Sequence, residues 1–530
     1  MRSATSLWLV LCCCGEGGPS GADHADPSDA GASDAGAPDA RAPDAAAVGD
    51  ASIVELDAGL REPAWAACDT ADWPTGYPRP PADTWCTTIS VPLDRAHPEG
   101  PAIDLRVARQ GAGPTRSASA VFVIEGGPGG SSVFTSGLIP GAMRGLSAEL
   151  DVVYVDLRGT GGSGYLGCPG RARSRAELIA CAAAQSGVDL NRYLSRDAAD
   201  DLEAVRSRLG YSEISLFAVS YGTRIAFEYL RRHSDRVTAA ILDGVAPPSA
   251  DLFSDTIGAL QRGIDLLVAD CERDPACLLV SPALRADLDA RRQVLRRSPR
   301  PVLVNGQPAS ETEGDYLAFL KAFLSQAESR FLVPRAIHAA NLGDNSPWNA
   351  LMSAILGAPV RDGAGTARAP GGSSLSSLIP EGRLGASFGS PVVNMANLCA
   401  EILPNSPGVD ALNLLGAQEE WLTGNILEKA NACASWEVLA LGPEDREPLR
   451  SSARILLLSG AIDLNVDPRW ASEARSTLSN AVEVVVPYAT HLTTYVPCVG
   501  AINVAYLRSG GDLARVDRSC LDSLPAPDWN

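Results

Sequence analysis

The chain has 530 residues, of which 45% are hydrophobic and 20% charged. This length and composition are typical of a globular protein with a sizeable core, built as one large domain with an insertion or as two domains. The formal net charge of −19 argues against nucleic acid as a partner, because phosphates need a basic surface.

The first 62 residues predict an exported protein. Residues 1–14 combine one arginine with a short apolar run that ends in cysteines, as an export signal does, and the run is too short to span a bilayer. Cys12 or Cys13 loosely matches the lipidated cysteine of a bacterial lipobox. We expect a cell-envelope lipoprotein, with a secreted protein as the alternative. The lipid anchor is its only expected membrane contact. Residues 15–62, rich in Ala, Asp and Pro, predict a disordered tether.

Ten further cysteines support export, since an even count in an exported protein suggests disulfides. Pairing in sequence order would join Cys68 to Cys86, Cys168 to Cys181, Cys271 to Cys277, Cys399 to Cys433 and Cys498 to Cys520. Sequence does not determine connectivity, so this pairing is a hypothesis. The chain has no C-x2-C, no H-E-x-x-H and no histidine pair at helical spacing, and we expect neither a metal nor another cofactor.

Strands and helices alternate through residues 63–248. We predict strands at 86–94, 103–108, 120–124, 151–156, 214–219 and 237–244, and helices at 197–209 and after residue 220. The central strands are continuous apolar runs, as in strands buried on both faces. Their alternation with helices predicts an α/β fold with a parallel sheet covered by helices on both faces.

The pattern changes after residue 248. Residues 249–392 contain helix-like segments and no strand series, so we expect an inserted helical lid, with a mobile loop around 363–377. The predicted lid helices cover 257–271, 283–295, 316–326 and 335–340. Strands resume at 453–460 and 481–486, so residues 393–530 complete the core. The chain has no internal repeat.

Ala218-Val219-Ser220-Tyr221-Gly222 lies between a predicted strand and a predicted helix. It is a variant of the nucleophile elbow G-x-S-x-G, in which a strained turn lifts a serine hydroxyl above the sheet. Small residues flank the serine because the strand and helix backbones pass closely there. Ser-x-Gly is common by chance, so the prediction depends on what surrounds it.

A glycine-rich turn follows the strand at 120–124. Four glycines surround Pro128 within residues 126–130, and their freedom lets main-chain N–H groups turn outward. A phosphate-binding loop is the alternative, but the P-loop and dinucleotide-binding spacings are both missing. We therefore predict an oxyanion hole beside Ser220.

A serine nucleophile needs a histidine base, which a carboxylate orients. His491 is the one histidine of the five that follows the late strand at 481–486, where such a base belongs. Asp463, just past the strand at 453–460, is the predicted acid, with Asp467 as its alternative. Asp156 and Arg158, after an earlier strand, are interpreted as a loop-bracing ion pair, with a catalytic role as the alternative.

With these motifs in order, the chain resembles the exported tripeptidyl aminopeptidase and proline iminopeptidase branch of the α/β-hydrolases. The resemblance covers roughly residues 86–520 and is weakest through the lid. It depends on the motifs at 91–94, 126–129, 156–161, 220–223, 242–245 and 460–463, together with His491. It implies an α/β-hydrolase fold with a lid, and hydrolysis through an acyl-enzyme.

Carried over to this sequence, the family roles give Ser220, Asp463 and His491 as the catalytic triad. The oxyanion hole falls on the N–H groups of Gly127 and Tyr221, with Gly126 as a further candidate. In the family, carboxylates in or after the lid hold the free amine of the substrate.

Glu401 resembles one of these amine-binding carboxylates, but an ordinary surface carboxylate is an equal alternative. Glu125 departs from the family pattern, where His or Pro is frequent at that position, and it is a more speculative second amine ligand. The expected substrate is a peptide with a free N-terminus. The alternatives are a small carboxylic ester and a non-catalytic binding role.

Overall fold

The computed structural model describes residues 63–71, 73–74, 77–111, 116–138, 145–169, 174–363, 375, 389–406, 429–524 and 528–529. The predicted signal, the tether and nearly all of the predicted loop at 363–377 lie outside these residues. Within the described part of the chain, no helix has the length and apolarity needed to cross a membrane.

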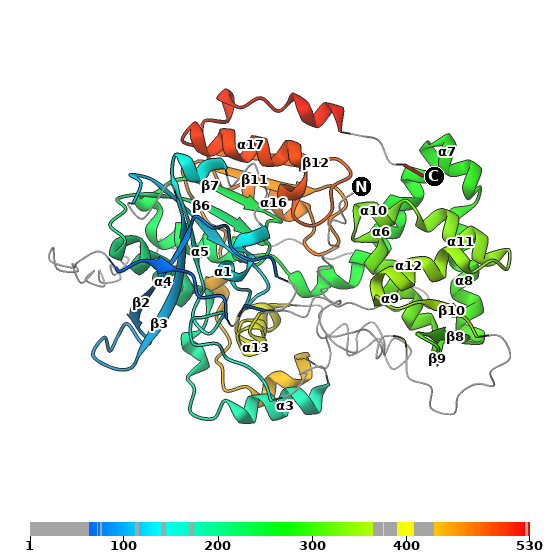
Figure 1. Ribbon diagram of the computed structural model, residues 1–530, viewed down its shortest axis with the longest axis horizontal. Helices are drawn as coiled ribbons and strands as arrows, with labels where there is room; N and C mark the ends of the chain where they lie inside the picture. The colour runs from blue at the N-terminus through cyan, green and yellow to red at the C-terminus, as the bar shows by residue number, and fades with distance from the viewer. Residues whose placement is uncertain are drawn as a thin grey trace, which may run out of the picture.

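Nine strands of the described chain form one mostly parallel sheet in the order β1-β2-β3-β5-β4-β6-β7-β11-β12 (Figure 1). Their bounds are β1 (Ala66–Ala67), β2 (Thr84–Pro92), β3 (Ala102–Gln110), β4 (Ala120–Ile124), β5 (Asp151–Val155), β6 (Ile214–Val219), β7 (Val237–Asp243), β11 (Ile455–Gly460) and β12 (Ala481–Val486). From β5 through β12 all neighbours are parallel. Their carboxyl ends therefore meet at one edge, where the loops after β4, β6, β7, β11 and β12 come together.

Alternate residues of the central strands enter two separate cores. In β6, Leu216 and Ala218 pack with α4, α5 and α16, whereas Phe217 and Val219 pack with α1 and α17 on the other face. The covering helices are α1 (Ser132–Thr135), α4 (Ser195–Arg208), α5 (Gly222–His233), α16 (Arg469–Arg475) and α17 (Pro497–Arg508). The predicted parallel sheet with two covered faces, and hence the α/β-hydrolase fold, is confirmed.

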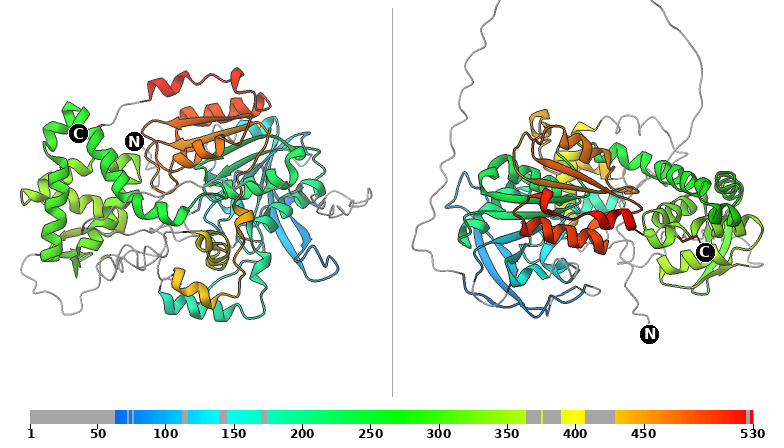
Figure 2. Two further views of the ribbon diagram at one scale, coloured as in Figure 1. Left: turned by 180° about the vertical axis from the view of Figure 1, so that it is seen from behind. Right: turned by 90° about the horizontal axis from the view of Figure 1, so that it is seen from above.

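The insertion is mainly helical, as predicted, and it lies beside the sheet in all three views (Figures 1 and 2). Its helices are α6 (Leu252–Arg273), α7 (Pro275–Val280), α8 (Leu284–Arg297), α9 (Glu313–Leu324), α10 (Ala327–Arg330), α11 (Val333–Asn341) and α12 (Ser346–Leu356). They enclose a core of their own, which Leu464 and Trp529 also enter from outside the insertion. The insertion is thus packed as a second body against the loop that follows β11.

The expectation of no strands in the insertion was wrong. An antiparallel sheet of order β10-β8-β9 is present, formed by β8 (Arg300–Val304), β9 (Gln307–Glu311) and β10 (Val360–Asp362). Asn305 and Gly306 join β8 to β9, and both have positive φ, of 49° and 80°. Asn-Gly between two short strands is the strongest local signal of a hairpin, and the sequence carried it.

All five predicted disulfides are confirmed in the predicted pairing. Two of them belong to a small cluster formed by α3 (Arg175–Ala184) and α13 (Pro391–Asn397), below the sheet in Figure 1. The chain continues from α13 into a π-helical turn, η6 (Leu398–Ile402), which carries Glu401.

Candidate active site

Ser220 occupies a sharp turn between β6 and α5, and its φ is +54°. An L-residue other than glycine rarely takes this left-handed conformation, which the surrounding structure must hold in place. The Ser220 N–H donates to the carbonyl oxygen of Asp243 at 2.8 Å. A Cβ on Gly222 would lie 2.7 Å from the carbonyl oxygen of Glu125 and closer still to that of Ile124, so glycine is required two residues after the serine.

Asp463 and His491 form a buried pair. His491 Nδ1 lies 2.7 Å from Asp463 Oδ2, while Asp463 Oδ1 accepts hydrogen bonds from the N–H groups of Asn465 at 2.8 Å and Val466 at 3.0 Å. Asp467, the alternative acid, forms an ion pair with Arg262 at 2.8 Å instead. The contacts favour Asp463 as the partner of the histidine.

His491 and Ser220 meet around Gly244, which follows β7. A Cβ on Gly244 would lie 2.9 Å from His491 Cε1 and 3.6 Å from the Ser220 nitrogen. His491 Nε2 is buried and has no hydrogen-bond partner among the described residues. It is the ring atom left available to take a proton from the serine hydroxyl.

Three of the remaining histidines belong to other ion pairs. His97, His233 and His338 lie 3.0, 3.0 and 2.8 Å from carboxylate oxygens of Asp94, Asp200 and Asp287, respectively. His24 lies outside the described residues.

Burial lowers the pKa of His491, because a low-dielectric interior disfavours the charged imidazolium. The carboxylate of Asp463 opposes this, and the charges of Asp243 and Glu125 add to its effect, so the net pKa is raised from the ordinary value of 6.5. The histidine therefore lies in a field that stabilises the imidazolium formed when it takes the serine proton.

The glycine-rich turn after β4 lies against the serine. A Cβ on Gly126 would be 2.8 Å from Ser220 Cβ and 3.1 Å from the Tyr221 nitrogen. The Gly126 N–H itself donates to Glu125 Oε1 at 3.0 Å, whereas the N–H groups of Gly127 and Tyr221 have no acceptor within the described ranges. The geometry favours Gly127 and Tyr221 as oxyanion donors, and Gly126 as the residue whose missing side chain leaves room.

The interpretation of Asp156 and Arg158 as a mutual ion pair was wrong. Arg158 donates to both carboxylate oxygens of Asp201 at 2.6 Å, while Asp156 accepts from Ser131, Val133 and Gly162. Each therefore braces a different loop, and the two side chains have separate sets of partners.

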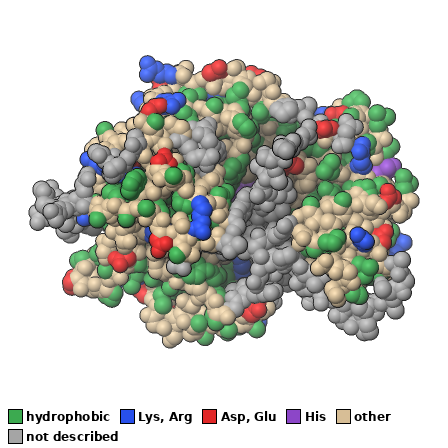
Figure 3. Space-filling view, in the orientation of Figure 1, with side chains coloured by type: hydrophobic (Ala, Val, Ile, Leu, Met, Phe, Trp, Pro, Cys, Tyr) green, Lys and Arg blue, Asp and Glu red, His purple; other side chains and the backbone are tan. Residues whose placement is uncertain are grey.

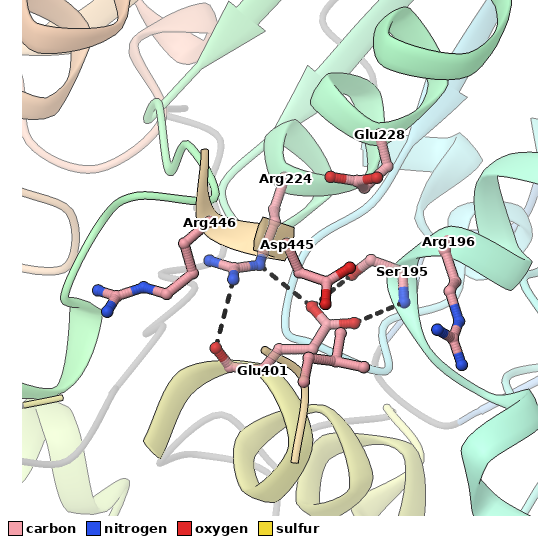
Figure 4. A pocket seen from close by; sticks show the side chains of 8 residues that line it. Ser195, Arg196, Arg224, Glu228, Glu401, Asp445 and Arg446 are labelled. Carbon is pink, nitrogen blue, oxygen red and sulfur yellow. Dashed lines mark hydrogen bonds and ion pairs between the residues drawn. The ribbon is translucent and has the colours of Figure 1, made fainter. Parts of the chain in front are cut away.

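Glu401 is buried, with 4% of its surface exposed, and it is not an ordinary surface carboxylate. Its Oε1 accepts from the Ser195 N–H at 2.8 Å. Its Oε2 accepts from the hydroxyls of Ser195 and Tyr221 at 2.9 and 2.7 Å, and from Arg224 Nε at 3.1 Å. Figure 4 shows the carboxylate between Arg224 on α5 and Ser195. These contacts tie Glu401 to the residue that follows the nucleophile.

A pocket opens at Glu401 (Figure 4). It is lined by Ser195, Arg196, Arg224, Glu228, Glu401, Leu441, Asp445 and Arg446, so that its walls carry three arginines and three carboxylates. A second, neighbouring hollow shares Ser195 and reaches Pro128, Gly129 and Tyr221 beside the predicted oxyanion hole. Sequence reasoning missed Arg224, although an arginine inside an otherwise apolar helix face signals a buried partner.

Among the described residues, no group of three or more His, Cys, Asp or Glu side chains could hold a metal ion.

On the face shown in Figure 3, acidic and basic side chains are interspersed.

Comparison with known proteins adds two family models and several relatives. Residues 119–352 match the model described as alpha/beta hydrolase fold, and residues 420–520 match the model described as TAP-like protein. A tripeptidyl aminopeptidase of Streptomyces lividans is 31% identical over 218 residues, which are 35% of this chain and 39% of the relative.

Two mycobacterial proteins match similarly. The serine protease Hip1 of Mycobacterium tuberculosis is 26% identical over 39% of this chain and 45% of the relative. Carboxylesterase B of the same species is 31% identical over 37% of this chain and 43% of the relative. The chain thus spans less than half the length of each of these three relatives.

Proposed function

Because this chain belongs to the α/β-hydrolases, in the branch of the tripeptidyl aminopeptidases, we propose that it removes residues from the free N-terminus of peptides through an acyl-enzyme. The observation that carries the proposal is the strained turn at Ser220, with the buried Asp463–His491 pair beside it. The elbow serine Ser220, the acid Asp463 and the base His491 come from three separate loops that meet at one edge of the sheet.

In the proposed reaction, Ser220 Oγ attacks the scissile carbonyl carbon while its proton passes to His491 Nε2. The carbonyl oxygen becomes an oxyanion that the Gly127 and Tyr221 N–H groups stabilise. The C–N bond then breaks as the imidazolium gives its proton to the departing amine. Water, deprotonated by the same histidine, hydrolyses the acyl-enzyme and restores the serine.

For an aminopeptidase, the pocket at Glu401 is the proposed site of the substrate amine. Glu401 lies next to Tyr221 in space, and Glu228 and Asp445 add carboxylates to the pocket. Arg224 forms an ion pair with Glu401 and balances part of this negative charge. In this proposal Glu401 also holds Tyr221 in place, because it accepts a hydrogen bond from the Tyr221 hydroxyl. Replacing Glu401 with Gln is expected to raise KM for an unblocked peptide.

We further propose that the protein acts outside the cytoplasm, in the cell envelope or secreted, with a lipid anchor at Cys12 or Cys13. The five disulfides fit an oxidising compartment. Neither nucleic acid nor a cofactor has a part in this proposal.

Ester hydrolysis is the second candidate. It is favoured by the relative named carboxylesterase B, and the same triad serves both reactions, because fold and triad do not determine the substrate.

The test compares an unblocked peptidyl anilide, its N-acetylated twin and a short-chain aryl ester, with Ser220→Ala as the blank. Turnover of the unblocked peptide and not its acetylated twin supports the aminopeptidase. Cleavage of the ester while both peptides are ignored replaces it with the esterase. A Ser220→Ala variant that matches the wild type on all three substrates refutes the assignment of the nucleophile.

A further inference from the structure

We propose that Asp243, the last residue of β7, is a positioning residue that holds the nucleophile and the base in register with one another. The inference rests on the proposed serine hydrolase function and concerns how its triad is assembled. It follows from two sets of hydrogen bonds that leave Asp243 in different directions.

The main chain of Asp243 holds the nucleophile. β6 and β7 are paired so that Val219 lies opposite Asp243, and the Asp243 carbonyl oxygen accepts the Ser220 N–H at 2.8 Å. This bond is made at the residue with the strained φ of +54°. A strained residue persists only where its surroundings hold it, and the end of β7 supplies one such restraint.

The side chain of Asp243 holds the base. Its Oδ1 accepts the N–H and hydroxyl of Thr493 at 3.0 and 3.1 Å, and its Oδ2 accepts the Thr494 N–H at 2.8 Å. Thr493 and Thr494 follow His491 by two and three residues. Between them and the histidine lies Leu492, with a left-handed φ of +66°. The carboxylate therefore fixes the loop that aims the imidazole.

Among the described residues, the Asp243 carboxylate accepts hydrogen bonds from Thr493 and Thr494 alone. Asp243 is fully buried, and no arginine or lysine pairs with it among the described residues. A buried, unpaired carboxylate is costly unless hydrogen bonds compensate it, and here the donors come from the histidine loop. Burial raises the pKa of Asp243 to about 6, against the lowering effect of the Thr494 and Thr493 N–H groups.

Asp243 also acts on His491 through its charge, since it is one of the groups that raise the histidine pKa. Two consequences of replacing it with Asn can therefore be separated. Loss of an acceptor loosens the loop and slows the reaction, and loss of the charge moves the histidine titration to lower pH.

The experiment measures the second-order rate at which a fluorophosphonate modifies Ser220, as a function of pH. This reagent requires the assembled triad but no particular peptide or ester. In the pH–rate profile, we expect Asp243→Asn to lower the plateau rate about 10–100-fold, by analogy with other small displacements of catalytic groups. We also expect it to move the acid limb, the range in which the rate falls as His491 is protonated, to lower pH. Thermal melting confirms that each variant is folded.

Asp156→Asn is the matched control. Asp156 is equally buried and accepts three hydrogen bonds just after strand β5, but the charges that raise the pKa of His491 are those of Asp463, Asp243 and Glu125. It should lower the melting temperature and leave the acid limb in place. If Asp243→Asn does not fold, Thr493→Val takes its place as the test variant, because it removes a single donor to Asp243. We expect Thr493→Val to slow modification about 2–10-fold.

An Asp243→Asn variant with the wild-type rate and acid limb would overturn the inference. So would a slower variant whose acid limb stays where the control has it, because that behaviour indicates a structural role only. If the wild type itself is not modified at Ser220, the proposed function fails, and that outcome is distinct from both.

Discussion

Gly244 lies where an added methyl group would meet His491, the proposed catalytic base. Its φ is +70°, and a Cβ there would be 2.9 Å from His491 Cε1 and 3.3 Å from His491 Nδ1. Carbon atoms in contact are normally about 3.5–4.0 Å apart, so the imidazole in Gly244→Ala must retreat by about 0.6–1.1 Å. A misplacement of this size costs on the order of 10²-fold in rate. We therefore expect kcat/KM to fall about 100-fold.

The substitution also strains the backbone, and a control separates the two effects. Gly510 has a φ of +64°, and the nearest atom to its added Cβ would be 3.9 Å away, on Arg454. An alanine in this left-handed conformation costs roughly 1–2 kcal/mol at either position. Gly244→Ala and Gly510→Ala should thus lose similar thermal stability, measured by melting, while Gly510→Ala keeps its activity. Equal kcat/KM values for the two variants would refute the placement of the histidine.

Two further predictions concern the same site. Because His491 must be neutral to act as a base and its pKa is raised, kcat/KM should fall as pH drops through a midpoint above 6.5, and a midpoint at or below 6.5 contradicts the described environment. Arg262 of α6 donates to the carbonyl oxygen of Asp463 at 2.8 Å, so Arg262→Met should lower kcat about 10-fold by loosening the acid loop. Arg285→Met, which breaks the exposed pair with Asp265, should change nothing measurable, and equal effects of the two substitutions would show that the contact of Arg262 with Asp463 is not functional.

The candidate triad could be proposed from sequence because each member follows a buried strand, and buried strands are apolar runs that local pattern reveals. The run at 214–219 leads into Ser220, and the runs at 453–460 and 481–486 lead into Asp463 and His491. In a parallel sheet these carboxyl ends meet at one edge, so the order along the chain predicted the meeting of residues 271 positions apart. The disulfide pairing could only be hypothesised from the order of the cysteines along the chain, and the structure confirms it.

The hairpin at 300–311 and the role of Arg224 were missed for different reasons. The two strands of the hairpin have only five residues each, and its Asn-Gly turn was outweighed by the helical segments around it. Arg224 has no sequence pattern that predicts its partner, because Glu401 lies 177 residues away and reaches it through a separate helix.

What the sequence by itself determined was the fold class and the identity of the candidate triad, since these depend on periodicity and on order along the chain. Only the tertiary structure decided that the Gly126 N–H donates to Glu125 and that Glu401 is buried beside Tyr221. It also decided that Asp243 accepts hydrogen bonds from the loops of both Ser220 and His491. The physical reason is that hydrogen bonds are directional and short. Whether a carboxylate meets a donor depends on ångström-scale placement of distant segments, and local composition carries no record of that placement.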